Sequence, residues 1–248
     1  MNLKLVRYFA LILGMMGVMK SCQAAGDSHF RAGLANYEAG QFSLAAQAFR
    51  DSLAEKPTSG TLLNLGLAEW QQGHEGQAIL SWQQAAWLNP LNRAAHDNLA
   101  YARETIQVND LDLTWFERAS TWLPANLWTW LAGGSLWLAV ALVTVPGFFR
   151  MPKAGWHQTV GAFAFGFFLL SLAPCAGVVT RSNIGILAER NTSLRLTPTR
   201  TSELSGSLPA GEPVRALRRR GDYLFVHTQN GDGWIARDQI MFLVPGRF

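Results

Sequence analysis

The side chains best suited to catalysis or metal binding are few in this chain and do not gather. Its 248 residues include five histidines and two cysteines. The histidines occur singly, without the i, i+4 spacing that places two ligands on one helix face, and Cys22 and Cys175 cannot build a thiolate site between them. No glycine-rich segment leads from a strand into a helix, as phosphate binding would need. The sequence therefore predicts no enzyme, no cofactor and no metal site.

A pattern of small, aromatic and proline residues recurs at a spacing of about 33 residues between Gly26 and Pro90. The first copy contains Gly33, Tyr37, Gly40, Phe42, Ala45, Phe49 and Pro57, and the second contains Asn64, Leu65, Gly66, Trp70, Gly73, Ala78, Trp82, Ala85 and Pro90. Small residues let two helices approach closely, an aromatic ring fills the space between neighbouring pairs, and proline ends the second helix. The pattern resembles the tetratricopeptide repeat, a helix–turn–helix docking unit, rather than an ordinary helical bundle with fortuitous glycines.

Two such units leave open faces, so a capping helix is expected over Asn92–Ile106, within a repeat region of residues 25–108. The first helices of the repeats would line a concave, partner-binding surface with Tyr37, Asn64, Leu67, Trp70 and Tyr101. This surface lacks the lysines and arginines with which some tetratricopeptide proteins hold a C-terminal carboxylate. An apolar or aromatic segment of a partner protein is therefore the expected ligand.

The N-terminus is typical of a secretory signal peptide over residues 1–24. Lys4 and Arg7 precede an apolar run from residue 9 to 18, and small residues follow at Ala24. Cleavage there would place the repeats outside the cytoplasm. Cys22 leaves lipid attachment as an alternative, although Lys20 fits poorly with the small, apolar run expected before a lipidated cysteine.

Two uncharged stretches predict transmembrane helices over residues 127–149 and 160–180, because a bilayer takes roughly twenty apolar residues. The connection at residues 150–159 carries Arg150 and Lys153, which favours the cytoplasmic side. Residues 25–126, including an interfacial linker at 109–126, and residues 181–248 would then both lie on the extracytoplasmic, periplasmic side of a bacterial inner membrane. Two small-residue pairs, Ser135 with Ala139 and Ala162 with Gly166, would bring the helices together.

After Thr180 the apolar residues alternate as in strands. Five strands are expected, over residues 184–189, 193–196, 213–217, 223–228 and 233–237, with Asn230-Gly231 as a hairpin turn. About sixty residues with five short strands would form a small barrel.

This C-terminal part resembles the bacterial SH3-like domain. The resemblance rests on segments beginning at Leu187, Leu194, Leu208, Gly221 and Gly231 and reading LAER, LRLTP, LPAGEPV, GDYLFV and GDGWI. It implies an all-β barrel with a candidate surface at Arg218, Arg219, Arg220 and Trp234. The arginines are expected at a turn, either solvated or in contact with lipid headgroups, acidic wall polymer or the repeats. Trp234 is either a core or strand-edge residue or a ligand contact.

Charge is divided between the two predicted outer domains. Residues 25–118 carry six basic and eleven acidic side chains, a balance of −5, whereas residues 181–248 carry ten arginines and six acids, a balance of +4. The overall net charge of +4 is therefore no indication of nucleic-acid binding. We expect instead a weak, salt-sensitive contact between the domains through Arg218–Arg220.

The order of signal peptide, repeats, two-span hairpin and SH3-like domain resembles the BatE-like proteins of Bat (aerotolerance) operons. The resemblance implies a membrane-anchored scaffold that cooperates with von Willebrand factor A proteins and a MoxR-type ATPase system in envelope stress tolerance. A different class of function stays open, in which the SH3-like domain binds or senses peptidoglycan. The predicted fold is thus a multidomain membrane protein with an all-α repeat solenoid, two transmembrane helices and an all-β small barrel.

Overall fold

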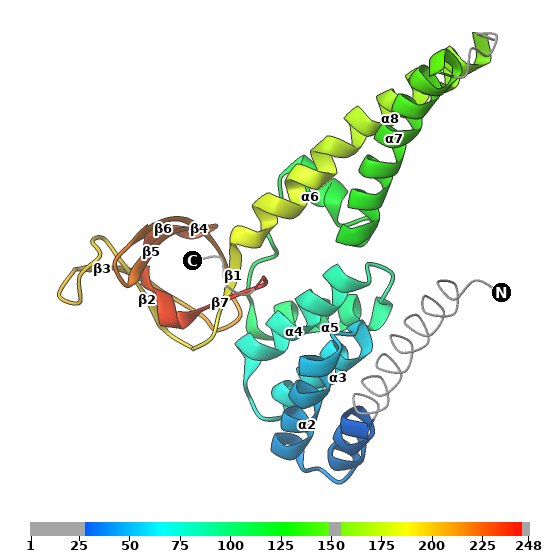
Figure 1. The fold of residues 1–248 in the computed structure, drawn as a ribbon. Coiled ribbons are helices and arrows are strands. Elements are labelled where there is room, and N and C mark those ends of the chain that lie inside the picture. The colour runs from blue at the N-terminus through cyan, green and yellow to red at the C-terminus, as the bar shows by residue number, and fades with distance from the viewer. Residues whose placement is uncertain (1–27, 149–154, 245–248) are drawn as a thin grey trace, which may run out of the picture.

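The computed structural model describes residues 28–148 and 155–244. The predicted signal peptide, with Cys22, and the basic connection at Arg150 and Lys153 lie outside the described residues. Three parts are visible in Figure 1: a helical region, a long hairpin of two helices, and a curved antiparallel sheet. The helical region and the sheet both lie at the same end of the hairpin (Figure 1).

The helical region is built from short helices that each pack against the next. A helix over residues 28–38 is followed by α2 (Phe42–Glu55), α3 (Ser59–Gln71), α4 (Glu75–Leu88) and α5 (Arg93–Ile106). Side chains of Thr58 and Asn92 cap α3 and α5 by accepting hydrogen bonds from the backbone of Thr61 and Ala95. Helix α5 occupies the segment in which the capping helix was expected.

The backbone of the helical region repeats as the sequence does. A Cβ atom on Gly33 would lie 2.5 Å from the ring of Phe49, and one on Gly66 would lie 2.4 Å from the ring of Trp82. Both glycines therefore make room for an aromatic ring from the following helix. The turns also match, because Gly40 (φ 74°) and Gly73 (φ 77°) both adopt the left-handed conformation that favours glycine.

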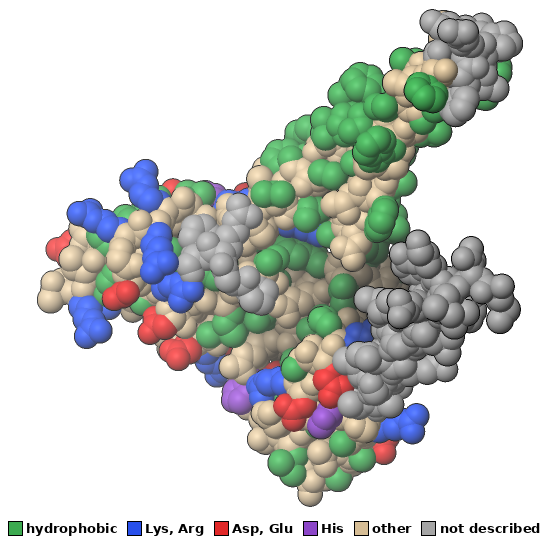
Figure 2. Space-filling view, viewed as in Figure 1, with side chains coloured by type: hydrophobic (Ala, Val, Ile, Leu, Met, Phe, Trp, Pro, Cys, Tyr) green, Lys and Arg blue, Asp and Glu red, His purple; other side chains and the backbone are tan. Residues whose placement is uncertain are grey.

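The long hairpin consists of α7 (Ala125–Phe148) and α8 (Gly155–Thr180), which pack along each other. Both are long and apolar enough to cross a membrane. In the most apolar 18-residue stretch of each helix, only 6% of α7 and 22% of α8 is buried. Core helices of a soluble protein would be mostly buried, whereas this hairpin presents hydrophobic side chains to its surroundings (Figure 2). Helix α8 begins five residues before the predicted boundary at Val160.

The face that α8 turns towards its neighbours differs from the prediction. Its buried residues are Gly161, Ala164, Ser171, Pro174 and Gly177. Ala162 is exposed, and a Cβ atom on Gly166 would meet nothing within 4 Å. The prediction that Ala162 and Gly166 bring the two helices together was therefore wrong, because α8 is apolar on all sides and its sequence does not single out a packing face.

Within residues 155–244 the sheet has seven strands in the order β3-β2-β6-β5-β4-β1-β7, all antiparallel to their neighbours. The strands are β1 (Ile184–Leu187), β2 (Thr192–Arg195), β3 (Leu204–Leu208), β4 (Pro213–Arg220), β5 (Tyr223–Thr228), β6 (Gly231–Ala236) and β7 (Ile240–Phe242). The prediction of five strands missed β3 and β7.

Two local predictions in the sheet were also wrong. Thr228 pairs with Gly231, so Gln229 and Asn230 form the β5–β6 turn, one residue earlier than the predicted Asn230-Gly231 turn. Arg218–Arg220 lie within β4 and pair with β5 rather than forming a turn. The turn itself falls on Gly221 and Asp222, where Gly221 has a φ of 60°.

The hydrophobic cores show how the helical region and the sheet are joined. One core lies inside the sheet and includes Leu194, Leu224, Val226 and Ile235. The core of α3, α4 and α5 includes Ile186 of β1, a residue from the sheet. The sheet is therefore packed directly against the helical region rather than being tethered to it only through the hairpin.

Candidate functional site

The predicted binding residues of the helical region meet in part. Trp70 packs against the buried ring of Trp82 at 5.6 Å between ring centroids and against Tyr101 of α5 at 6.0 Å. Leu67 lies one turn before Trp70 and is also half-buried. Tyr101 remains 60% exposed. We call Leu67, Trp70 and Tyr101 the aromatic face; it joins α3 to α5 and leaves a tyrosine ring available to a partner.

The other two predicted binding residues have local roles. Asn64 is half-buried and donates from Nδ2 to the carbonyl oxygen of Gly60 at 2.9 Å, within its own helix. Tyr37 packs edge-on against Phe42 at 5.3 Å and against the core that α2 and α3 form together, which includes Phe49 and Leu65. Tyr37 and Trp70 occupy equivalent sequence positions, but the Trp70 ring contacts Tyr101 of α5 whereas the Tyr37 ring contacts Phe42 of α2, so Tyr37 is not part of the aromatic face.

On the sheet, four residues form a row across neighbouring strands. Arg195 pairs with Trp234, Trp234 with Phe225, and Phe225 with Arg218. Directly opposed residues project to the same side of a sheet, so these side chains share its outer face. We call them the arginine–aromatic row. Trp234 is 9% exposed and its ring lies 5.3 Å from that of Phe225, so it is mainly a packing residue within this row.

Arg219 and Arg220 continue β4 beyond the row, opposite Leu224 and Tyr223. Both are exposed, and Nε of Arg219 donates to the carbonyl oxygen of Gly221 at 3.1 Å. The predicted contact of Arg218–Arg220 with the repeats was wrong, because other residues join the sheet to the helical region.

The contact between sheet and helical region combines close backbone approach with polar pairs between side chains. Asn109 donates from its backbone and from Nδ2 to the carboxylate of Glu212, at 3.1 and 2.6 Å. Nε of Arg190 donates to Glu75 at 3.0 Å. At the start of α4, a Cβ atom on Gly76 would lie 2.2 Å from the carbonyl oxygen of Leu187. The sheet and the helical region are therefore in close van der Waals contact through their backbones. They are not held together only by attraction between opposite charges.

Of the ion pairs in the described part of the chain, the most buried one joins the linker to the sheet. Glu117 of α6 (Trp115–Ser120) is 0% exposed and receives hydrogen bonds from Arg215 at 2.7 and 2.9 Å. Its carboxylate also accepts hydrogen bonds from the backbone and hydroxyl of Thr114 at 2.9 Å. Burial alone would raise the pKa of Glu117, but the bonds from Arg215 and Thr114 outweigh it and lower this pKa to about 2.

Sequence reasoning missed these joining residues. Thr114 and Glu117 do carry a readable signal, since a threonine followed three residues later by a glutamate is a capping box. Nothing local pairs Glu117 with Arg215, or marks Gly76 as a point of contact. Among the described residues there is no group of three or more His, Cys, Asp or Glu side chains arranged to hold a metal ion.

Comparison with known proteins does not add a family to this description. No protein-family model matches the chain, and no curated protein matches it.

Proposed function

We propose that the protein is a non-enzymatic, membrane-anchored scaffold that docks partner proteins through tetratricopeptide-like repeats and an SH3-like sheet domain. The observation that carries the proposal is the aromatic face. Trp70 is supported from below by Trp82, while Tyr101 beside it is 60% exposed. Rigid, partly exposed aromatic side chains with packed support are the residues that most often anchor protein–protein contacts.

The recurring hairpins support the tetratricopeptide assignment. The glycine–aromatic pairs Gly33–Phe49 and Gly66–Trp82 repeat with the same close approach, and the turn glycines repeat with φ values of 74° and 77°. Repeats of this kind present a docking surface along their first helices. All three members of the aromatic face lie on such helices, Leu67 and Trp70 on α3 and Tyr101 on α5.

The close contact between sheet and helices supports a scaffold in which the aromatic face and the arginine–aromatic row keep a fixed position relative to each other. Glu117, Glu212 and Gly76 all lie at this contact. A partner that engages both the aromatic face and the arginine–aromatic row would lose little additional freedom on binding the second surface.

Membrane insertion of α7 and α8 would anchor the scaffold, in the bacterial cytoplasmic (inner) membrane, with both outer parts on the periplasmic side. The basic residues Arg150 and Lys153 in the connection favour this orientation. A BatE-like role implies that the partners are von Willebrand factor A proteins acting with a MoxR-type ATPase system.

The test is direct binding between the solubilised full-length protein and purified von Willebrand factor A domains from the same genome. Tyr101→Ala should weaken binding at least tenfold without lowering the melting temperature, because Tyr101 is largely exposed. Leu44→Ala is the matched control, because Leu44 is also a large exposed side chain but lies on α2, outside the aromatic face. This variant should bind as the wild type does. Equal binding by Tyr101→Ala and wild type would contradict the proposed site.

The arginine–aromatic row favours a second candidate function, binding of peptidoglycan by the sheet. Exposed Arg218 beside the Phe225–Trp234 pair offers a cation and an aromatic edge to an acidic sugar polymer. The full-length protein should then sediment with purified cell wall in detergent, and Arg218→Ser should reduce the sedimented fraction. A sedimented fraction unchanged by Arg218→Ser would exclude the row as a wall-binding site.

A further inference from the structure

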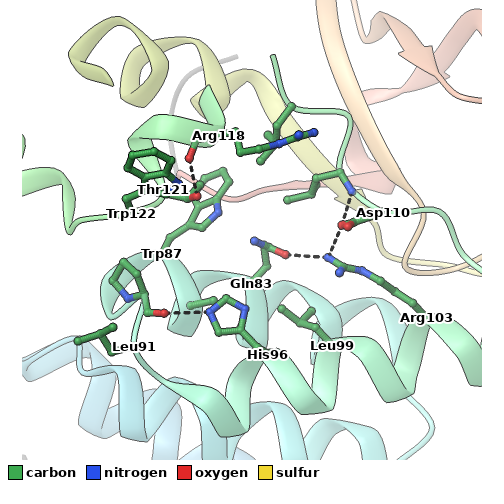
Figure 3. A pocket seen from close by; sticks show the side chains of 14 residues that line it. Gln83, Trp87, Leu91, His96, Leu99, Arg103, Asp110, Arg118, Thr121 and Trp122 are labelled. Atoms are coloured by element: carbon green, nitrogen blue, oxygen red, sulfur yellow. Dashed lines mark hydrogen bonds and ion pairs between the residues drawn. The ribbon is translucent and has the colours of Figure 1, made fainter. Parts of the chain in front are cut away.

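A cavity of about 580 Å³ lies between the helical region and the segment that leads into the membrane hairpin. Figure 3 shows its walls. One wall comes from α4 and α5 and the other from residues 110–122, including α6. Charged side chains, namely Arg103, Asp110 and Arg118, line it together with tryptophans and leucines. Neither the predicted binding surface nor the arginine–aromatic row includes any of these residues.

The cavity lies beside the base of the apolar hairpin. Trp122, at one side of it, is 72% exposed and lies three residues before α7 begins at Ala125. The indole nitrogen of Trp128, in the first turn of α7, donates to the carbonyl oxygen of Ser120 at 3.2 Å, which fixes α6 next to the start of the helix. Exposed tryptophans at the end of an apolar helix are typical of the headgroup region of a bilayer. When α7 is inserted, the cavity therefore lies at the membrane surface.

The charges in the cavity are not balanced. Arg103 is paired with Asp110 at 3.0 Å and also donates to Gln83 at 3.2 Å (Figure 3). Arg118 is exposed and forms no ion pair with the acidic side chains of the part of the chain that the structure describes. With two arginines against one aspartate, the lining carries an excess positive charge supplied by Arg118.

The remaining lining explains why a lipid fits better than a free anion. Trp87, Leu91, Leu99 and Trp122 present apolar surface next to the cation. A bare phosphate would leave this apolar surface uncovered, whereas the glycerol and upper acyl carbons of a lipid would cover it. A volume of about 580 Å³ is also within the usual range of small-molecule sites.

We infer that this cavity binds the headgroup of an anionic glycerophospholipid, with Arg118 contacting the phosphate and Trp122 the glycerol region. The inference rests on the proposed membrane insertion of α7 and α8. The bound lipid would fix the height of the helical region above the bilayer and so present the aromatic face at a constant distance from the membrane.

Native mass spectrometry of the full-length protein in a neutral detergent tests this, with phosphatidylglycerol and phosphatidylcholine added in turn. The wild type should retain phosphatidylglycerol preferentially. Arg118→Gln should weaken that retention about fivefold, the effect expected for one basic residue near an anionic lipid surface. Arg118→Lys should restore most of it, because the charge is kept.

Arg220→Gln is the matched control, since Arg220 is also exposed but lies on the sheet; it should retain lipid as the wild type does. Equal retention of the two lipids, or unchanged retention by Arg118→Gln, would overturn the inference. Displacement of the lipid by millimolar glycerol 1-phosphate would also overturn it, by assigning the site to a soluble phosphate.

The membrane insertion on which the inference rests is measured separately, by flotation of the same variants with vesicles after alkaline carbonate. If the wild type does not float with the vesicles, the proposed anchoring is contradicted. Intact flotation without lipid preference would contradict the lipid site alone.

Discussion

The carboxylate of Glu117 is held by the guanidinium of Arg215 through two hydrogen bonds, from Nη1 at 2.7 Å and from Nη2 at 2.9 Å. The pair joins α6, just before the α7–α8 hairpin, to β4 of the sheet. Immediately beside it, a Cβ atom on Gly177 of α8 would lie 2.3 Å from the carbonyl oxygen of Phe116. Linker, hairpin base and sheet therefore meet at one closely packed point.

Breaking this pair should be costly at neutral pH and nearly neutral in acid. The pKa of Glu117 falls from its ordinary value of 4.5 to about 2 in the folded protein. A carboxyl with a lowered folded pKa stabilises the protein fully above its unfolded pKa and loses that contribution as the pH falls towards the folded pKa. Glu117→Gln should therefore lower the free energy of unfolding by about 3 kcal/mol at pH 7, with the difference shrinking between pH 4.5 and 2.

Denaturant unfolding of the detergent-solubilised protein at several pH values measures this difference. Glu189→Gln, at an exposed position just after β1, is the control and should follow the wild type throughout. A Glu117→Gln difference that stays constant down to pH 2.5 would mean that ionisation of Glu117 does not contribute.

The close approach of α4 to β1 leads to a second prediction, which concerns stability. Gly76 and Gly60 are each the second residue of a helix, α4 and α3. A Cβ atom on Gly76 would overlap the carbonyl oxygen of Leu187, whereas one on Gly60 would meet nothing within 4 Å. Gly76→Ala should destabilise the protein by about 1–3 kcal/mol through overpacking, while Gly60→Ala should stabilise it by up to about 1 kcal/mol through helix propensity.

Thermal unfolding of the two variants side by side measures these opposite effects. Because the substitution and the position within the helix are the same, the difference between them isolates the contact with the sheet. Two equally stabilised variants would show that α4 and β1 do not approach each other as closely as the structure has it.

The helical hairpins were predictable because the residues that pack against each other lie close together in the sequence. Gly33 and Phe49 must be compatible with each other, Gly66 and Trp82 must be compatible in the same way, and the repetition made both pairs visible. Strand β5 was predicted over its full length, because Tyr223–Thr228 is rich in aromatic and β-branched residues and has turn residues on both sides. The two membrane-length helices were predictable from the absence of charge over about twenty residues.

The missed features depend on partners far away in the sequence. Strand β3 reads LSGSL, mostly exposed small residues without a strand-like alternation, and it is held by pairing with β2. Strand β7 has only three residues and is held by pairing with β1. The Glu117–Arg215 pair and the approach of Gly76 to Leu187 each bring together residues about a hundred positions apart, which no local pattern records.

Topology gives a third prediction. Reporter fusions at Asp110 and at the C-terminus should both show an extracytoplasmic location, because both outer parts lie at the same end of the α7–α8 hairpin. A fusion within residues 150–153 should show the opposite location. Signals of opposite type at Asp110 and the C-terminus would contradict insertion of the hairpin as two complete spans.

The proposed scaffold function is tested most directly by a photocrosslinking residue placed at Tyr101 in the intact membrane. The exposed ring beside Trp70 should be covered by a partner protein, so irradiation should give one discrete adduct containing a von Willebrand factor A protein. The adduct should weaken when Leu67→Arg introduces a charge into the aromatic face, and the same crosslinker at Leu44 should not form it. No adduct at Tyr101, or the same adducts at Tyr101 and Leu44, would contradict the account.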